Sequence, residues 1–238
     1  MIVILTGAGI SKESGLNTYR DADGTWTSVP IHEVATPEAF ARDPVRVHSY
    51  YNSRRRKLIS GEVAPHAAHL ALARLQQTLP DVMLVTQNVD NLHERAGSPR
   101  VIHMHGELLK ARCLGCEAHH VWHDDIMVET PCPACGAAGR LRSAVVWFNE
   151  RPLHLPEIAE ALRRCRLFIA IGTSGSVYPA AGFVDLVPGH SIELNLAPSA
   201  VASHFAEAVY GPASETVPAL VEQLLDWHAP SHSQSAHS

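Results

Sequence analysis

The stretch Ile2-Val3-Ile4-Leu5-Thr6-Gly7-Ala8-Gly9-Ile10-Ser11 decides the fold. Its aliphatic run predicts a buried strand that leads into a glycine turn and then into the start of a helix. Because glycine has no Cβ, backbone amides in such a turn can approach a pyrophosphate, and the positive end of the following helix favours the same anion. The stretch therefore predicts a phosphate-binding turn at the carboxyl end of a buried strand.

Similar short apolar runs recur along the chain, and helical segments alternate with them. This alternation predicts an α/β fold, with a mostly parallel sheet covered by helices on both faces. Ligands of such sheets bind at the carboxyl ends of the strands, where this chain has polar or glycine-rich residues. The expected strands are 2–6, 82–86, 101–104, 167–171 and 191–195, and the expected helices are 44–60, 66–79, 156–165 and 217–227.

The glycine turn departs from the fingerprint of hydride-transferring dehydrogenases. Lys12 stands where that fingerprint has its third glycine. No second strand ending in an acidic ribose ligand follows about 20 residues later. A dehydrogenase is therefore disfavoured.

The composition and charge of the chain disfavour nucleic acid and membranes as binding partners. The chain has 238 residues, of which 46% are hydrophobic, so it can bury a sizeable core. With 19 Lys and Arg against 24 Asp and Glu, its net charge of -5 gives no bulk cationic surface for non-specific nucleic-acid binding. No apolar run approaches the roughly 20 residues that span a bilayer, and no basic region precedes the first strand. We therefore expect a cytoplasmic protein without a membrane partner or broad nucleic-acid binding.

The cysteine spacing predicts a metal site. Four of the five cysteines form two Cys-x2-Cys pairs separated by fifteen residues: Cys113, Cys116, Cys132 and Cys135. This spacing is typical of one structural zinc ion held by four thiolates. The nearby His119, His120 and His123 are alternative ligands, although the paired spacing favours the cysteines. A zinc ribbon can also bind nucleic acid, but the acidic residues of this module disfavour that role. The fifth cysteine, Cys165, is expected to be structural at a helix–strand junction.

Motifs along nearly the whole chain, from Ile2 to about Leu225, resemble those of the sirtuins, the NAD-dependent protein lysine deacylases. The zinc cysteines also occupy that family's position. In the family's order, the motifs are Gly7-Ala8-Gly9-Ile10-Ser11 with Ser14-Gly15 and Tyr19-Arg20, Thr86-Gln87-Asn88-Val89-Asp90, His103-Met104-His105-Gly106-Glu107-Leu108, Gly172-Thr173-Ser174 and Glu193-Leu194-Asn195.

The resemblance implies one catalytic unit over residues 1–228. Its Rossmann-like NAD domain comprises 1–26, 67–108 and 145–228, the helical part of a small domain comprises 27–66, and the zinc module comprises 109–144. Residues 229–238 have little to bury, and we expect a disordered tail there.

The implied reaction transfers an acyl group from a protein lysine to ADP-ribose, and it releases nicotinamide and 2'-O-acyl-ADP-ribose. A ribose hydroxyl must lose a proton, and an imidazole suits that task because its pKa of about 6.5 lies near working pH. His105 is the expected base, whereas His103 is expected to point to the other face of its strand and to be structural. Asn88 and Asp90 are implied to hold nicotinamide and its ribose, although this segment could simply cap the following helix.

The resemblance also implies the residues that contact NAD and the acyl-lysine substrate. The implied NAD contacts are Gly7, Ala8, Gly9, Ile10, Ser11, Tyr19, Arg20, Trp26, Gln87, Asn88, Val89, Asp90, Gly172, Thr173, Ser174, Asn195, Leu196, Ala197 and Ala213, and the substrate contacts are Tyr51, Arg54, Val146, Trp147 and Phe148. Two positions depart from the family. Tyr19 replaces the usual phenylalanine, and Asn149 replaces a glycine, although asparagine tolerates positive φ.

The pair Tyr51 and Arg54 bears on the choice of acyl group. Residues three apart on a helix share a face, and a guanidinium with a phenolic hydroxyl suits a carboxylate. The pair resembles the Tyr-x-x-Arg signature of the class III sirtuin branch that removes succinyl, malonyl and glutaryl groups. Alternatively, Tyr51 is a core residue and Arg54 belongs to the solvated run Arg54-Arg55-Arg56-Lys57.

Two other functions compete with deacylation. Mono-ADP-ribosyl transfer shares the first bond cleavage and differs in the nucleophile. A non-catalytic NAD-sensing module is the other alternative, but a pure binder has no use for a base beside the ribose.

Overall fold

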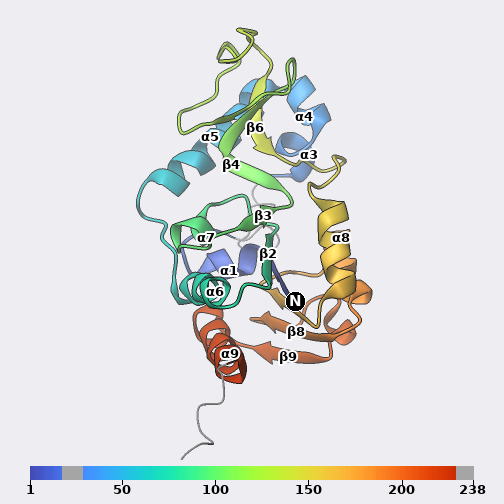
Figure 1. Cartoon of the computed structure of the whole chain (residues 1–238). Helices are drawn as coiled ribbons and strands as arrows, with labels where there is room; N and C mark the ends of the chain where they lie inside the picture. Colours follow the sequence, from blue (N-terminus) through green and yellow to red (C-terminus); the bar gives the residue numbers. More distant parts are fainter. Residues whose placement is uncertain (18–28, 229–238) are drawn as a thin grey trace, which may run out of the picture.

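The computed structural model describes residues 1–17 and 29–228, and its larger part is built on a parallel sheet (Figure 1). The six strands are ordered β3-β2-β1-β7-β8-β9, and all adjacent pairs are parallel. Their bounds are β1 (Ile2–Thr6), β2 (Val82–Thr86), β3 (Val101–His103), β7 (Leu167–Ile171), β8 (His190–Asn195) and β9 (Glu207–Tyr210). The five expected strands are confirmed, and the short, exposed edge strand β9 is an addition.

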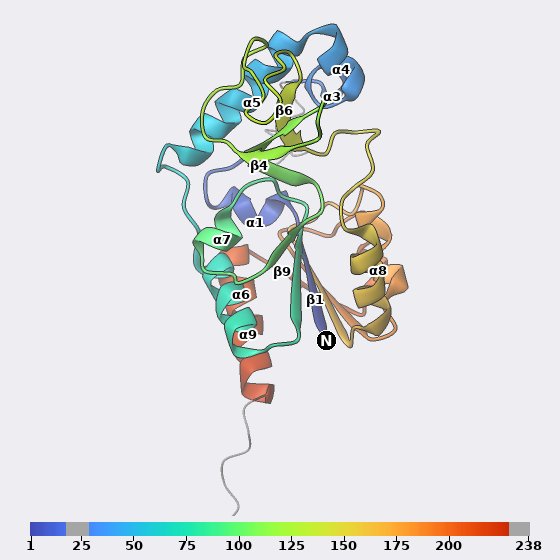
Figure 2. The same cartoon turned by 45° about the horizontal axis from the view of Figure 1, so that its top comes forward.

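Helices cover both faces of this sheet, as predicted. Because side chains alternate along a strand, Ile2 and Ile4 of β1 pack on one face, whereas Val3 and Leu5 pack on the other. Figure 2 shows the helices α6 and α9 on one side of the sheet and α8 on the other. The bounds are α6 (Ala67–Thr78), α8 (Leu155–Arg164) and α9 (Ala213–His228), with short 3-10 turns at η1 (Ala180–Gly182), η2 (Val184–Leu186) and η3 (Ala202–His204).

A smaller part of the molecule combines three helices with a second sheet. The helices are α3 (Ile31–Val34), α4 (Pro37–Arg42) and α5 (Pro44–Ile59). The start of α5 carries a proline, and the Asp43 side chain accepts a hydrogen bond from the Arg46 amide there. The second sheet is antiparallel, in the order β5-β4-β6, with β4 (Gly106–Cys113), β5 (His119–Val121) and β6 (Leu141–Val145). Strands β4 and β6 run across the expected module boundaries at 108/109 and 144/145, so the zinc module continues from the strands that join it to the large sheet.

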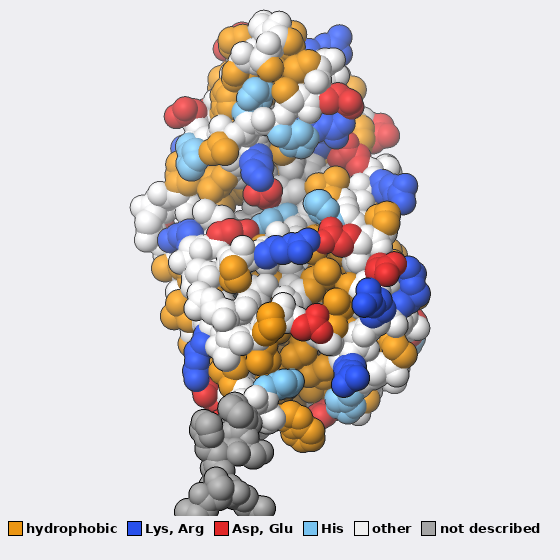
Figure 3. Space-filling view, viewed as in Figure 1, with side chains coloured by type: hydrophobic (Ala, Val, Ile, Leu, Met, Phe, Trp, Pro, Cys, Tyr) orange, Lys and Arg blue, Asp and Glu red, His pale blue; other side chains and the backbone are white. Residues whose placement is uncertain are grey.

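Two short helices lie where the two parts meet, α1 (Ala8–Lys12) after β1 and α7 (Leu92–Arg95) after β2. Side chains of both charges are interspersed over the face in Figure 3, in keeping with the modest net charge of -5. Within residues 1–17 and 29–228, each helix is too short or too polar to cross a bilayer.

Candidate active site

A cavity of about 620 Å³ lies between the carboxyl ends of the parallel strands and the small domain. The turns after β1, β2, β7 and β8 form one side of it, and α5 and the segment after β6 form the other. The predicted NAD contacts that line it are Gly7, Ala8, Gly9, Gln87, Asn88, Val89, Gly172, Thr173, Ser174, Asn195, Leu196 and Ala197. Sequence reasoning therefore located most of one wall.

The glycine turns after β1 and β7 touch each other through their backbones. The Gly9 amide donates to the Gly172 carbonyl at 2.8 Å, and a Cβ on Gly9 would come within 2.6 Å of the Gly172 Cα. Gly172 also has φ +61°, and its own Cβ would meet the Ile10 amide nitrogen at 2.4 Å. Only glycine fits these two positions, and the absence of side chains leaves backbone open to the cavity. Such a cradle fits the pyrophosphate of a dinucleotide.

His105 lines the same cavity, and its protonation follows from its contacts. Its Nδ1 lies 3.1 Å from the Gln87 carbonyl oxygen, which can only accept a hydrogen bond. The proton of the neutral ring therefore belongs on Nδ1, which leaves Nε2 as a proton acceptor. Burial lowers the pKa of His105 below 6.5, although the bond to Gln87 opposes the shift. His105 is thus a neutral base at neutral pH.

Asn88 and Asp90 meet at the hydroxyl of Ser11. The Asn88 Nδ2 donates to the Gly7 carbonyl at 3.0 Å and to the Ser11 Oγ at 3.1 Å, and that Oγ donates to Asp90 at 3.0 Å. Asp90 also accepts from the Leu92 amide at 3.1 Å, so it caps α7 as the alternative interpretation expects. Burial raises the pKa of Asp90, and its hydrogen bonds oppose the rise. The cap and a place in the site are therefore compatible.

Ser11, Asn88 and Asp90 line a second cavity of about 150 Å³. Ala8, Asn88 and Val89 belong to the walls of both cavities. A cavity of about 150 Å³ holds a single six-membered aromatic ring. The smaller cavity is therefore suited to the nicotinamide end of NAD.

Several predicted NAD contacts have a different place. Ile10 is fully buried in the core between the sheet, α6 and α9. Ala213 begins α9 and lines neither cavity. Tyr19, Arg20 and Trp26 lie outside the described residues, as does the expected tail at 229–238.

The segment after β6 contributes the three predicted substrate contacts, Val146, Trp147 and Phe148, to the large cavity. The Val146 amide donates to the His105 carbonyl at 2.8 Å, so this segment is bonded directly to the backbone of the expected base. Asn149 follows with φ +71°, which confirms that this position needs a residue that tolerates positive φ.

Tyr51 and Arg54 lie on one side of α5 but belong to different cavities. Tyr51 is buried and lines the large cavity, whereas Arg54 lines the smaller one, with its guanidinium 5.4 Å from the centre of the Tyr50 ring. The two cavities adjoin through shared walls, and the convergence of both side chains on one group stays a prediction.

Sequence reasoning missed several lining residues, including Lys12, Tyr50 and Glu150. Glu150 is held by the buried Arg142, whose guanidinium carbon also lies 3.2 Å from the centre of the Trp147 ring. Glu150 lies two residues after the last predicted substrate contact, Phe148, and the sequence carries no other indication of its role. The Arg142 contact depends on a turn that the sequence does not specify.

The four predicted zinc ligands lie together at one end of the small domain. Their sulfur atoms are all within 4.8 Å of one another, with 3.8 Å between Cys113 and Cys135 and 3.7 Å between Cys116 and Cys132. A tetrahedral zinc with Zn–S bonds of about 2.3 Å requires sulfur atoms about 3.8 Å apart. The four cysteines therefore fit one structural zinc ion with no open position. His120 lies 3.7 Å from the Cys132 sulfur but outside this group, and Cys165 is buried at the end of α8, as predicted.

Comparison with known proteins places this geometry in a family. The model of the Sir2 family matches residues 7–179. The NAD-dependent protein deacylase of Shigella flexneri is 56% identical over 229 residues, which cover 94% of this chain and 84% of the relative. That of Pasteurella multocida is 54% identical over 94% of this chain and 97% of its own length.

Solved structures agree with these relatives. A mutant Sir2 homologue bound to ADP-ribose has a TM-score of 0.88 at 36% identity, over 95% of this chain and 92% of its own. A Sir2 homologue bound to NAD has a TM-score of 0.85 at 36% identity, over 95% of this chain and 90% of its own. This chain therefore belongs to the Sir2 family.

Proposed function

We propose that this chain is an NAD-dependent protein-lysine deacylase that releases nicotinamide and 2'-O-acyl-ADP-ribose. One observation carries the proposal. His105, whose Nδ1 is bonded to the Gln87 carbonyl so that Nε2 is the proton acceptor, lines the cavity that contains the two glycine turns, and that cavity adjoins the small cavity of Asn88 and Asp90. A base in the same cavity as a pyrophosphate cradle is suited to ribose chemistry and has no purpose in a binding module.

Different residues of the two cavities would bind NAD and accept the proton. NAD supplies a ribose carbon activated by the nicotinamide leaving group. The backbone of Gly7, Gly9 and Gly172 would hold the pyrophosphate, and Asn88 and Asp90 would hold the nicotinamide and its ribose. His105 would accept the proton of a ribose hydroxyl at Nε2, which is efficient because a neutral imidazole is present at working pH.

Replacing His105 with alanine tests this assignment. We expect deacylation of an acetyl-lysine peptide to be lost, while the fold and NAD binding persist, because the change removes a proton acceptor and no core contact. Nicotinamide exchange reports the earlier bond cleavage and should fall less. The exposed His32 gives a matched control, and deacylation by H105A within a few-fold of the wild type would exclude the role.

We further propose that acidic acyl groups, such as succinyl and malonyl, are substrates beside acetyl. The support is the placement of Tyr51 and Arg54 in the walls of adjoining cavities, with the resemblance of the pair to the Tyr-x-x-Arg signature. A guanidinium that binds a desolvated carboxylate typically contributes about 2–5 kcal/mol. R54M should therefore lower desuccinylation at least about thirtyfold and change deacetylation much less.

Arg56 offers the matched control for this experiment. It lies on the same helix, but its guanidinium pairs with Asp125 of the zinc module at 2.5 Å. R56M should leave the ratio of desuccinylation to deacetylation unchanged. An equal fall of both activities in R54M would make Arg54 a cofactor or structural residue, and no fall in either would exclude the acidic-acyl proposal.

We also propose a cytoplasmic location. The support is the four-thiolate zinc site, since cysteines in this arrangement are kept reduced in the cytosol. Fractionation of cells that express the chain, with zinc content measured in each fraction, tests the location.

A further inference from the structure

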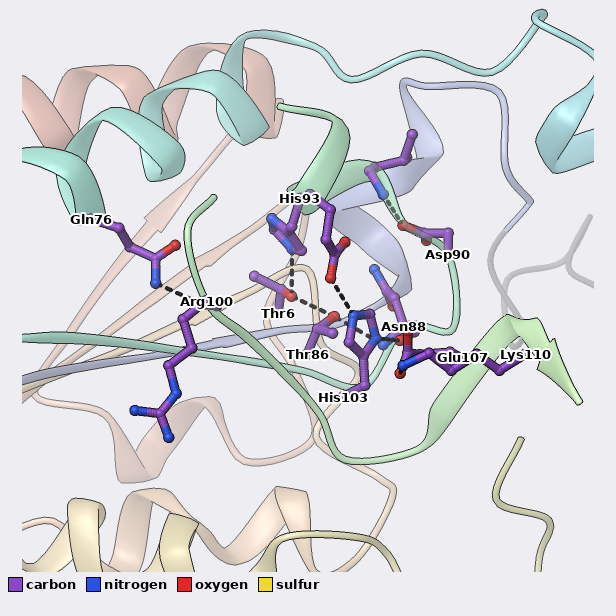
Figure 4. A network of polar contacts seen from close by, with 12 residues as sticks. Thr6, Gln76, Thr86, Asn88, Asp90, His93, Arg100, His103, Glu107 and Lys110 are labelled. Atoms are coloured by element: carbon purple, nitrogen blue, oxygen red, sulfur yellow. Dashed lines mark hydrogen bonds and ion pairs between the residues drawn. The ribbon is translucent and has the colours of Figure 1, made fainter. Parts of the chain in front are cut away.

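An acid–base pair of a buried histidine, His103, and a partly exposed carboxylate, Glu94, lies beside the segment of Gln87 and Asn88 and takes no part in the roles assigned above. His103, at the end of β3, has only 8% of its side chain exposed. Its Nε2 lies 2.6 Å from the carboxylate of Glu94 in α7, and its Nδ1 lies 3.3 Å from the backbone carbonyl of Asn88. Figure 4 shows His103 beside Asn88 within this network of polar contacts.

The two partners of His103 determine its protonation. A carbonyl and a carboxylate both accept hydrogen bonds, and a neutral imidazole has only one N–H to donate. Both contacts are satisfied only when both ring nitrogens carry protons. Burial lowers the pKa of His103, but the hydrogen bond and the charge of Glu94 outweigh burial and raise that pKa above 6.5.

The other titratable groups around His103 leave this pairing intact. Glu107 of β4 adds negative charge but is bonded to Lys110 at 2.6 Å. His93 of α7 is neutral, because burial lowers its pKa to about 4. Burial raises the pKa of Asp90, and a positive charge on His103 opposes only part of that rise. Glu94 is therefore the one carboxylate among these neighbours that is bonded to the imidazole.

The Asn88 carbonyl, which His103 contacts, belongs to the segment after β2 that also supports His105. The preceding carbonyl, of Gln87, accepts from Nδ1 of His105, so two histidines that are two residues apart dock on successive carbonyls. The backbone N–H of Asn88 donates a hydrogen bond to the Thr86 hydroxyl at 3.0 Å. A shift of this segment would move both the Asn88 carboxamide and the Gln87 carbonyl, which is bonded to the His105 ring.

We propose that Glu94 and His103 are positioning residues for the reaction: Glu94 holds His103 as a double hydrogen-bond donor, and His103 fixes the Asn88 carbonyl. The pair thereby sets the orientation of the Asn88 carboxamide and of the His105 ring. This inference rests on the proposed function for its kinetic consequences but not for the protonation state of His103.

Nicotinamide exchange is the kinetic test, because it depends on Asn88 and avoids the proton transfer to His105. In E94A we expect kcat for exchange to fall at least about tenfold, since a hydrogen bond of a charged group is lost. The KM for the acyl peptide should stay within about twofold. In E94Q, the amide NH2 group can donate to Nε2 of a neutral ring whose one proton stays on Nδ1, so part of the rate should return. The control is E107Q, which removes a neighbouring charge without removing a bond to His103.

The pH profile separates positioning from a merely structural role. Without Glu94, the pKa of His103 falls, and the ring loses its second proton at neutral pH. The exchange rate of E94A relative to the wild type should therefore rise as the pH is lowered from about 8.5 to about 6, where protonation restores the Nδ1 donor. The same ratio for E107Q should be flat. A loss in E94A that is equal at all pH values would overturn the proposal.

Nitrogen NMR of histidine-labelled protein tests the pair without any enzymatic assay. We expect both nitrogens of His103 to be protonated at about pH 7.5 in the wild type and only one in E94Q. A neutral His103 in the wild type would overturn the inference even if the enzyme is active. An inactive wild type with a doubly protonated His103 would instead count against the proposed function alone.

Discussion

Replacing Glu150 with alanine should destabilise the protein strongly, because it isolates a buried cation. The Arg142 side chain is only 4% exposed, and its guanidinium donates to both Glu150 oxygens, at 2.8 and 3.0 Å. Glu150 also accepts from the Trp147 amide at 2.7 Å, so one carboxylate closes the turn that carries Trp147 into the large cavity.

The size of the effect follows from what Arg142 retains. Breaking a buried ion pair by removing one partner costs about 3–5 kcal/mol. Glu150 is 26% exposed, and Arg142 keeps its bond to the Val145 carbonyl and its place over the Trp147 ring, so the lower end applies. We expect a loss of about 3 kcal/mol in the free energy of unfolding. For a chain of this length, that corresponds to a Tm lower by roughly 6–12 °C.

Urea denaturation of the wild type, E150A, R142M and the double variant measures this loss and the coupling between the two residues. The pair Arg100–Glu157 is the control, because it is exposed and should contribute no more than about 1 kcal/mol. The KM for an acyl peptide should also rise in E150A, since the substrate segment is released. If E150A lowers the free energy of unfolding no more than E157A does, the Arg142–Glu150 pair does not stabilise the fold as expected.

Two further predictions concern metal and acid. Purified protein should contain one zinc per chain, and chelation or C113S should unfold the zinc module, because the free energy of metal binding contributes to folding; active protein without zinc in elemental analysis would contradict this. Burial lowers the pKa of His69 to about 2 and that of His93 to about 4, so both are neutral in the folded state. The unfolded chain takes up protons below about pH 6.5, and stability should therefore fall as the pH drops from about 6.5 toward about 4, by up to about 1.4 kcal/mol per pH unit for each histidine. Urea denaturation across this window should show a shallower fall in H69Q and H93Q, and a flat wild-type profile would refute the assignment.

The large sheet could be predicted because its strands carry their own signal. Buried parallel strands such as β1 and β7 are continuous aliphatic runs, and glycine or polar residues mark their ends. The small sheet carries no such signal. β4 mixes charged and apolar residues, and the exposed β5 has only three residues. Their pairing depends on contacts between distant segments and on the cysteine cluster, which local sequence does not encode.

The candidate site shows the same division. His105 and Asn88 could be predicted because they follow strands whose carboxyl ends meet at one edge of the sheet. The bond between Glu94 and His103 could not, because it depends on how α7 turns back over β3. Tyr51 and Arg54 were correctly placed on one helix face, but the division between two cavities is set by Asn88 and Val89, which come from another strand end.

Mass analysis of the reaction products is the decisive measurement for acyl transfer from lysine to ADP-ribose. The purified chain would be incubated with NAD and acetyl-, succinyl- or butyryl-lysine peptides, with H105A in parallel. We predict deacylated peptide, nicotinamide and O-acyl-ADP-ribose in equal amounts from the wild type, and loss of the acylated product in H105A. ADP-ribose attached to protein or peptide, or no NAD-dependent loss of the acyl group, would contradict the proposed deacylation.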